Sequence, residues 1–297
     1  QGRIDELKQL ADFVLQQYYP HCLSEENPYA EFLGEVAIRT ARLVAQWQAC
    51  GFMHGVLNTD NMSVLGLTLD YGPFGFMEAF NHDHICNHSD HQGRYSYRNQ
   101  PAIGQWNVFA FGQTLVPLIN SVETTEQALD NYKSAFEQRW QQLCRAKFGL
   151  ETAQENDANL FNEFFQLMQD HRADFTLSFR TLSHLKSEKT AADDELFALF
   201  SGAQALPDWL HRYRERCRTE NRNDSERNAA MLTANPKYIL RNYLAQIAIE
   251  KAQQDDFSEI DRLHRILQQP FAEQPESEIY ASLPPDWAGD LCVSCSS

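Results

Sequence analysis

Apolar residues recur every three or four positions along most of this chain, and this period limits its fold more than any other feature. Between residues 29 and 50 the recurring positions are Leu33, Val36, Ala37, Thr40, Val44 and Trp47. Such spacing places one largely apolar stripe on a helix, and Gly51 is typical of the residue just past a helix end. The same period predicts helices over residues 1–20, 102–119, 126–148, 159–169, 194–200 and 208–218. We therefore expect a mainly α (α+β) protein.

Two later helices are predicted from their start signals. Asn235 followed by Pro236 is a typical pair of N-cap and first-turn residues. Asp255 or Asp256 is expected to cap the next helix, which should end before Pro270. The C-terminal half of the chain is therefore expected to consist of successive helices.

The helical period is interrupted between residues 52 and 100. Short apolar runs over residues 62–65 and 67–69, separated by Gly66, predict a tight β-hairpin. From residue 72 to residue 100 the chain is rich in His, Asn, Asp and Gly and has no period. A long segment of this kind inside a compact domain is usually functional or disordered, so this stretch is the first place to expect a site.

Charge and cysteine usage exclude several classes of protein. The net charge of -16 argues against nucleic-acid binding, because phosphates are held by basic faces. No run approaches the roughly 20 apolar residues of a membrane span, and the first residues lack the apolar core of a signal peptide. Seven cysteines in 297 residues do not form the dense framework of a small secreted domain. We expect a cytoplasmic location in a bacterium, or a mitochondrial one in a eukaryote, and no membrane partner.

One loop carries residues suited to nucleotide chemistry. His54 opens a run that ends in Asp60 and Asn61, and an Asp-Tyr-Gly turn begins nine positions later at Asp70. A helix, a His-led loop ending in Asn, a hairpin and an Asp-aromatic-Gly turn follow in this order in the C-lobe of protein kinases, where H-R-D-L-x-x-x-N precedes D-F-G. There, the Asn and the second Asp hold metal ions on the ATP phosphates. Asn61 and Asp70 are therefore the predicted ligands of Mg²⁺ or Mn²⁺.

The loop departs from the kinase pattern at one position. The catalytic Asp of a kinase lies two residues after the His, where this chain has Val56, and Asp60 is the only carboxylate in the loop. A phosphotransferase of the kinase type remains an alternative, although Val56 speaks against it. A non-catalytic pseudokinase scaffold is another. In the plainest reading, Asp60 only caps a hairpin and Asp70 only begins a turn.

Several stretches of the chain together resemble the selenoprotein O family of protein adenylyltransferases. They are residues 54–61, 70–77, 86–90 and 235–244, and the final Cys-Ser-Ser that starts at Cys295. The resemblance implies a kinase-like fold that binds ATP in a reversed orientation and transfers AMP to Ser, Thr or Tyr hydroxyls of proteins. It also implies Asn61 and Asp70 as metal ligands, Asp70 beside the nucleotide, and Asp60 as the base.

The same resemblance implies that the ATP-covering N-lobe is absent from this chain. The family also needs a glycine-rich loop, a strand Lys paired with a helix Glu, and Arg residues that grip the phosphates, and residues 1–28 contain no such pattern. We expect residues 1–122 to form the C-lobe core, with the catalytic loop and the activation-loop region. Residues 123–297 are expected to form a helical region with a Cys-containing tail. The chain alone is expected to be inactive.

Three other features each allow two interpretations. The spacing Cys292-x-x-Cys295 is typical of redox sites, and some members of the resembled family carry selenocysteine at the position of Cys295, so a redox role competes with an inert thiol. A disulfide between Cys86 and Cys295 is one hypothesis. The His-rich stretch 82–91 is either a polar surface loop or a zinc site with spacings unlike known zinc modules. Asn107 either braces the catalytic loop, as an Asp does in kinases, or packs in the core.

Overall fold

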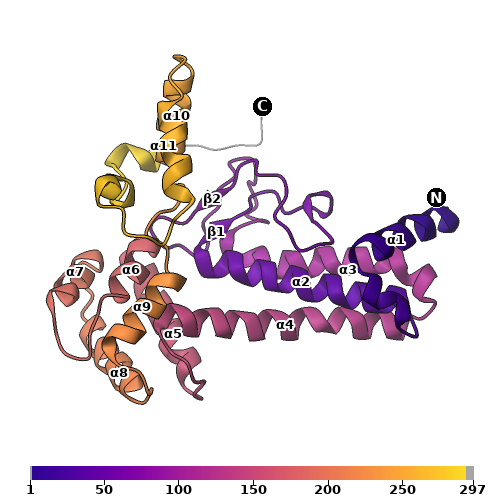
Figure 1. The fold of residues 1–297 in the computed structure, drawn as a ribbon, viewed down its shortest axis with the longest axis horizontal. Helices are drawn as coiled ribbons and strands as arrows, with labels where there is room; N and C mark the ends of the chain where they lie inside the picture. Colours follow the sequence, from indigo (N-terminus) through magenta and orange to yellow (C-terminus); the bar gives the residue numbers. More distant parts are fainter. Residues whose placement is uncertain (1, 292–297) are drawn as a thin grey trace.

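The computed structural model describes residues 2–291, whose arrangement is shown in Figure 1. Within these residues the one sheet has two short antiparallel strands, β1 (Phe52–Met53) and β2 (Gly75–Phe76). The α-helices are α1 (Ile4–Tyr18), α2 (Pro28–Cys50), α3 (Gln100–Ile119), α4 (Val122–Phe148), α5 (Asp157–His171), α6 (Phe175–Leu182), α7 (Ala191–Leu199), α8 (Leu206–Arg218), α9 (Asp224–Ala234), α10 (Asn242–Ala252) and α11 (Ser258–Leu267). The expectation of a mainly α protein with a small β component is confirmed.

Three long helices form the centre of the molecule. α2, α3 and α4 pack against one another and run along the longest axis in Figure 1. Their shared core includes Leu33 and Ala37 of α2, Leu115 of α3 and Tyr132 of α4, all buried. α4 begins at the expected domain boundary near residue 122 and lies along the length of α2. Residues on both sides of that boundary therefore share one hydrophobic core.

The helices α5 to α9 form a second cluster at one end of α4 (Figure 1). Aromatic rings fill its interior. The ring centroids of Phe148 and Phe161 are 4.6 Å apart, and those of Trp209 and Tyr213 are 5.2 Å apart, with the rings stacked in both pairs. Beyond this cluster, α10 and α11 pack on each other and project as a two-helix arm.

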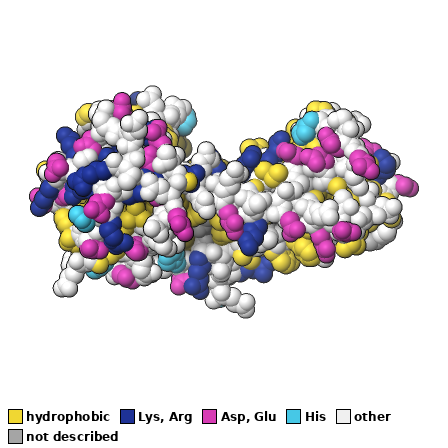
Figure 2. Space-filling view, turned by 90° about the horizontal axis from the view of Figure 1, so that it is seen from below, with side chains coloured by type: hydrophobic (Ala, Val, Ile, Leu, Met, Phe, Trp, Pro, Cys, Tyr) yellow, Lys and Arg dark blue, Asp and Glu magenta, His cyan; other side chains and the backbone are white. Residues whose placement is uncertain are grey.

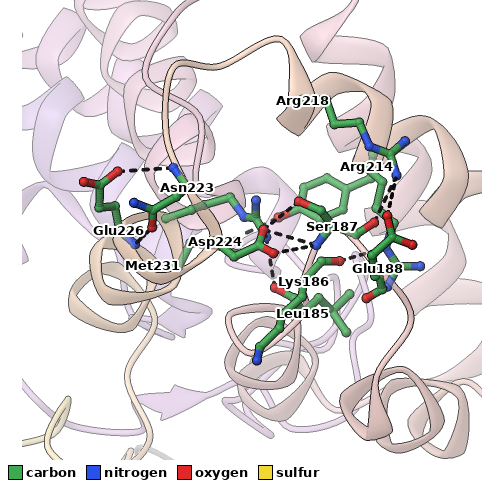
Figure 3. Close-up of polar contacts among 12 residues, drawn as sticks. Leu185, Lys186, Ser187, Glu188, Arg214, Arg218, Asn223, Asp224, Glu226 and Met231 are labelled. Carbon is green, nitrogen blue, oxygen red and sulfur yellow. Dashed lines mark hydrogen bonds and ion pairs between the residues drawn. The ribbon is translucent and has the colours of Figure 1, made fainter.

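Polar contacts fix the connection between α6 and α7 (Figure 3). Asp224, the first residue of α9, accepts hydrogen bonds from the backbone N–H of Ser187 at 3.0 Å and from its hydroxyl at 2.7 Å. Arg214 of α8 donates from Nε to the carbonyl oxygen of Lys186 at 2.9 Å. These contacts tie α8 and α9 to the loop between α6 and α7.

The surface carries mixed charges. Figure 2 shows acidic, basic and hydrophobic side chains interspersed on the face seen from below. The acidic excess of the chain therefore forms no continuous patch on that face. In the part of the chain that the structure describes, no helix has both the length and the apolar character that a membrane crossing needs.

The helix predicted over residues 29–50 is confirmed as α2. The side chain of Asn27 accepts a hydrogen bond from the Ala30 N–H at 3.2 Å and so caps its start. Gly51 adopts φ 70° just past its end, which is the glycine stop that the sequence predicts. The five helices predicted between residues 102 and 218 are also present, and each begins two to four residues earlier than predicted.

The predicted β-hairpin around Gly66 is confirmed only in part. Gly66 does make a turn, with φ 69°, but its flanks are joined by a single antiparallel bridge between Met62 and Thr68. The two strands of the sheet are formed instead by residues far apart in sequence, with Phe52 paired to Phe76. Their aromatic side chains are in edge-to-face contact at 5.5 Å, which favours this pairing.

The prediction that Asn235 and Pro236 start a helix is also wrong. Asn235 is the residue just past the end of α9, and the next helix, α10, begins at Asn242. Its side chain is fully buried and bonded to other elements, so it is not available to cap the residues that follow. At α11, Asp256 accepts a hydrogen bond from the Ser258 N–H at 3.0 Å, close to the predicted cap.

Candidate active site

The loop from residue 54 to residue 61 is held in place by side chains of α3. Gln100 bridges it to β1, because its Nε2 donates to the carbonyl oxygen of Phe52 at 3.0 Å and its Oε1 accepts from the His54 N–H at 2.9 Å. Asn107 donates from Nδ2 to the carbonyl oxygen of Leu57 at 3.0 Å. Both side chains are buried. The expectation that Asn107 braces this loop is confirmed.

Gly55 allows the loop to approach the polar segment that follows β2. It adopts φ 81°, and a Cβ at this position would lie 2.9 Å from both Cys86 Sγ and the Pro73 carbonyl oxygen. Asn87 donates from Nδ2 to the carbonyl oxygen of Gly55 at 3.1 Å. Any side chain at this position would be strained and would push the two segments apart.

His54 connects the loop to the segment that carries Asp70. It is 1% exposed, and its Nε2 donates to the carbonyl oxygen of Leu69 at 2.8 Å. Burial lowers the pKa of His54, against smaller opposing effects of the Leu69 carbonyl and the Asp70 charge. Its Nδ1 has no hydrogen-bond partner within residues 2–291. A neutral, buried imidazole in this position holds the backbone and is poorly placed to act as a base.

The two predicted metal ligands project from neighbouring segments. The bridge between Met62 and Thr68 pairs the residue after Asn61 with a residue two before Asp70. Asn61 donates from Nδ2 to the carbonyl oxygen of Val56 at 2.9 Å, and its Oδ1 makes no hydrogen bond to the described residues. The Asn61 Oδ1 is therefore held in one position and has no hydrogen-bond partner among the described residues.

Asp70 has an unusual backbone conformation. It lies in the left-handed region at φ 54°, and its side chain is exposed. Its carboxylate makes no hydrogen bond or ion pair with residues 2–291, although its charge is felt by His54. Few non-glycine residues adopt this backbone region, and those that do often lie at functional positions.

Asp60 and Val56 occupy opposite environments within the same loop. Asp60 lies in the short 3₁₀ turn η2 (Thr59–Asn61) and is exposed, with no hydrogen bond or ion pair from its side chain to the described residues. Val56 is 6% exposed and points into the core. The position that carries the catalytic Asp in kinases thus lies in the hydrophobic interior, and the loop's single carboxylate faces solvent.

Cys86 lies beneath the loop. It is buried, its Sγ is 3.7 Å from the carbonyl oxygen of Met53, and burial raises the pKa of the thiol to about 12.

Cys292 and Cys295 are outside the described residues, so the pairing of Cys86 with Cys295 stays a prediction. Across residues 2–291, no three His, Cys, Asp or Glu side chains converge as ligands of one metal ion, and the His-rich stretch 82–91 supplies no such set.

The stretch 235–244 fastens the two-helix arm to the core. Asn235 accepts a hydrogen bond from Lys147 Nζ at 2.9 Å and donates to both the Lys147 carbonyl oxygen and Ser183 Oγ at 2.9 Å. Arg241 makes a two-pronged ion pair with Asp174 at 2.7 and 3.1 Å, and both side chains are buried. Sequence reasoning identified this stretch by resemblance, and the structure gives its physical role.

The same stretch reaches the segment that follows Asp70. A Cβ on Gly75 would lie 3.4 Å from the side chain of Asn242, so the start of α10 lies against β2. Glu78 lies near Arg241, and burial raises the pKa of Glu78 while the Arg241 charge lowers it. The arm therefore contacts the region between Asp70 and Cys86 directly.

Known proteins similar to this chain agree on one family. The family model described as protein adenylyltransferase SelO matches residues 1–268. A relative from Herminiimonas arsenicoxydans, named protein nucleotidyltransferase YdiU, is 58% identical over 293 residues, which cover 99% of this chain and 59% of the relative. A relative of the same name from Burkholderia ambifaria is 49% identical over 309 aligned residues, which again cover 99% of this chain and 59% of the relative. The chain thus spans about 59% of the length of these relatives. It belongs to the SelO family of protein adenylyltransferases.

Proposed function

We propose that this chain carries the catalytic loop and the metal ligands of a protein adenylyltransferase, which transfers AMP from ATP to Ser, Thr or Tyr hydroxyls of proteins. Membership of the SelO family supports nucleotidyl transfer. The observation that carries the proposal is the pair of free oxygen donors, Asn61 Oδ1 and the Asp70 carboxylate, on segments held by hydrogen bonds. Because the chain spans about 59% of its relatives, the activity is proposed for a protein of their full length.

A kinase-like C-lobe is the fold that we infer for residues 1–122. The order of α2, the His-led loop, the turn at Gly66, Asp70 and then α3 supports it. So does the contact of Asn107 with the carbonyl oxygen of Leu57, since the corresponding kinase helix braces the same loop. Residues 123–297 would form the helical extension. No glycine-rich strand pair of an ATP-covering lobe is found among residues 2–291.

Mg²⁺ or Mn²⁺ fits the donors that Asn61 and Asp70 offer. Such ions prefer hard oxygen ligands and are commonly bound by one or two protein side chains, with phosphates and water completing the coordination. When bound, the ion would neutralise charge on the ATP phosphates. The protein's contribution is to orient the two donors. Asn61 is oriented by its bond to Val56, and the Asp70 segment by the bond from His54 to Leu69.

Asp60 is the proposed base. The hydroxyl of the protein substrate would attack the α-phosphorus of ATP, pyrophosphate would leave, and the proton of the hydroxyl would pass to the Asp60 carboxylate. The side chain of Asp60 is exposed and unpaired among the described residues, which leaves it accessible to a substrate. The buried Val56 offers no such group, which disfavours the kinase arrangement.

The position of the transferred label tests the proposal. The full-length protein should label protein substrates from ATP carrying the label at the α-phosphate and not at the γ-phosphate. Asp60→Asn should reduce this labelling by about 10²–10⁴-fold, the usual range for losing a general base, while nucleotide binding is kept. Transfer from the γ-phosphate would make the protein a kinase. Nucleotide binding without transfer from either position would favour the scaffold.

A further inference from the structure

A groove between α2 and α4 gathers four arginines in this acidic protein. Its volume is about 720 Å³, and Arg39, Arg42, Arg139 and Arg145 line it together with Gln138 and Gln142. No carboxylate belongs to its lining within the described part of the chain. With 41 acidic and 25 basic residues in the chain, a surface with four cations and no anion is a clear local exception.

Arg139 is held in the groove by neutral groups. Its Nη1 donates to Gln142 Oε1 at 2.7 Å on the same helix, and its Nη2 donates to Gln46 Oε1 at 3.1 Å across the gap to α2. An amide oxygen orients a guanidinium but leaves its positive charge uncompensated. The Arg139 side chain is therefore positioned in advance, and the cost of ordering it on binding is reduced.

The other three arginines also keep most of their charge available. Arg42 and Arg145 form no ion pair with residues 2–291. Arg39 has one acidic neighbour, Glu35, whose Oε2 is 3.4 Å from its Nε, and its guanidinium also lies 4.4 Å from the centroid of the Tyr19 ring. Only one of the four cations is thus partly neutralised.

The chemistry of the groove favours a particular kind of anion. A guanidinium pairs with carboxylate or phosphate through two parallel hydrogen bonds. Compact phosphate sites are commonly built on the backbone N–H groups of a helix N-terminus or a nest. Here the arginines project from the middle and the last turn of two helices, and Arg145 lies in the last turn of α4. Four separate cations along an open groove instead suit a ligand with carboxylates spread along its length.

We infer that this groove binds an acidic segment of a polypeptide. If the proposed function holds, the segment belongs to a protein substrate. The groove also contains Leu65 and Gly66, the turn that joins Asn61 to Asp70. Gly66 packs directly on Arg39, because a Cβ at this position would lie 2.8 Å from the Arg39 Cβ. A bound segment would therefore contact the turn that supports the candidate active site.

Direct binding tests the inference without ATP or transfer. Fluorescence anisotropy of the 297-residue chain would use a labelled peptide of alternating Glu and Gly, with a Gln-for-Glu peptide as control. Arg42→Glu and Arg139→Glu should each weaken binding of the acidic peptide about tenfold. The matched control is Arg265→Glu, an exposed residue of α11 with the same change of charge, and it should bind like the wild type. Arg139→Gln serves in place of Arg139→Glu if the reversal disturbs folding.

Three outcomes would overturn the inference. Equal loss in Arg265→Glu would show that net charge alone controls binding. Equal binding of the Gln peptide would show that carboxylates are not recognised. Displacement of the acidic peptide by tripolyphosphate at much lower concentration than by unlabelled peptide would assign the groove to a compact phosphate. Because no step of transfer is measured, an inactive enzyme that still binds the acidic peptide would contradict only the proposed function.

Discussion

Lys147 is a buried cation without an acidic partner among the described residues, so the pKa of its ammonium group depends mainly on its burial. It is 3% exposed, its Nζ donates to Asn235 Oδ1 at 2.9 Å, and it lies 3.9 Å from the centroid of the Phe179 ring. No carboxylate among residues 2–291 forms an ion pair with it. Burial lowers the pKa of Lys147 from 10.5 to about 8, against smaller opposing effects of Cys50 and Cys144.

The direction of the pH effect follows from this lowered pKa. Between pH values of about 8 and 10.5 the unfolded chain holds a proton on Lys147 that the folded protein has released. Folding stability therefore rises with pH in that window. Retaining the charge at neutral pH destabilises the fold by about 3 kcal/mol. About 2 kcal/mol of this should be recovered between pH ~7.5 and pH ~9.5.

Replacing Lys147 by Met removes the charge and keeps most of the volume. The variant also leaves Asn235 Oδ1 without its donor, which costs about 1–3 kcal/mol. The two effects oppose each other, so Lys147→Met should lie within about 2 kcal/mol of the wild type at pH ~7.5. At pH ~9.5 the wild type should gain about 2 kcal/mol relative to the variant.

Urea unfolding followed by circular dichroism measures both values. Taking the difference between wild type and variant at each pH cancels the other titrating groups. Lys133→Met is a matched control on the same helix, because the Lys133 side chain is 76% exposed and its Nζ is 4.0 Å from Glu137. The control should show no change with pH relative to the wild type. A difference between wild type and Lys147→Met that is constant from pH ~7.5 to pH ~9.5 would refute the reasoning.

Three further predictions concern the candidate site and its supports. Asp70→Asn, which tolerates the left-handed backbone, should abolish metal-dependent transfer by the full-length protein without shifting its urea midpoint, and undiminished transfer would contradict the metal assignment. Arg241→Met should lower the free energy of unfolding by about 3–5 kcal/mol, because it strands the buried Asp174 carboxylate; a loss below ~1 kcal/mol in urea unfolding would exclude this. The hypothesis of a Cys86–Cys295 disulfide predicts a peptide that joins these two residues in mass spectrometry of oxidised protein, and its absence would count against that disulfide.

The long helices could be predicted from the sequence because each buries an apolar face and exposes a polar one. α6 and α9 escaped prediction for different reasons. α6 has only eight residues, and its polar Ser178 and Arg180 are buried together with its apolar side chains, so burial does not follow polarity along it. α9 buries only Arg227 and Met231, and its start is marked by a capping box between Asn223 and Glu226 rather than by an apolar stripe.

Local sequence patterns gave wrong predictions where a side chain bonds to residues far away in the sequence. Asn235 has the residue type and the following Pro of a helix start, but its amide is bonded to Lys147 and Ser183, which lie 88 and 52 residues away. The sheet was missed for a related reason. Phe52 pairs with Phe76 across a long intervening segment, and no local pattern indicates which of several aromatic residues pairs with which.

The residue types of the candidate site could be read from the sequence, whereas its shape depends on contacts between residues that are far apart in the sequence. The Oδ1 of Asn61 is held in one orientation because Nδ2 of the same amide donates to the carbonyl oxygen of Val56. That carbonyl is placed by a loop whose backbone is bonded to Gln100, Asn107 and Asn87, all of them at least 32 residues away in sequence. None of these three side chains carries chemistry of its own. Substitutions at these supports should therefore displace the proposed metal donors without removing them, and should weaken the proposed metal binding before they abolish it.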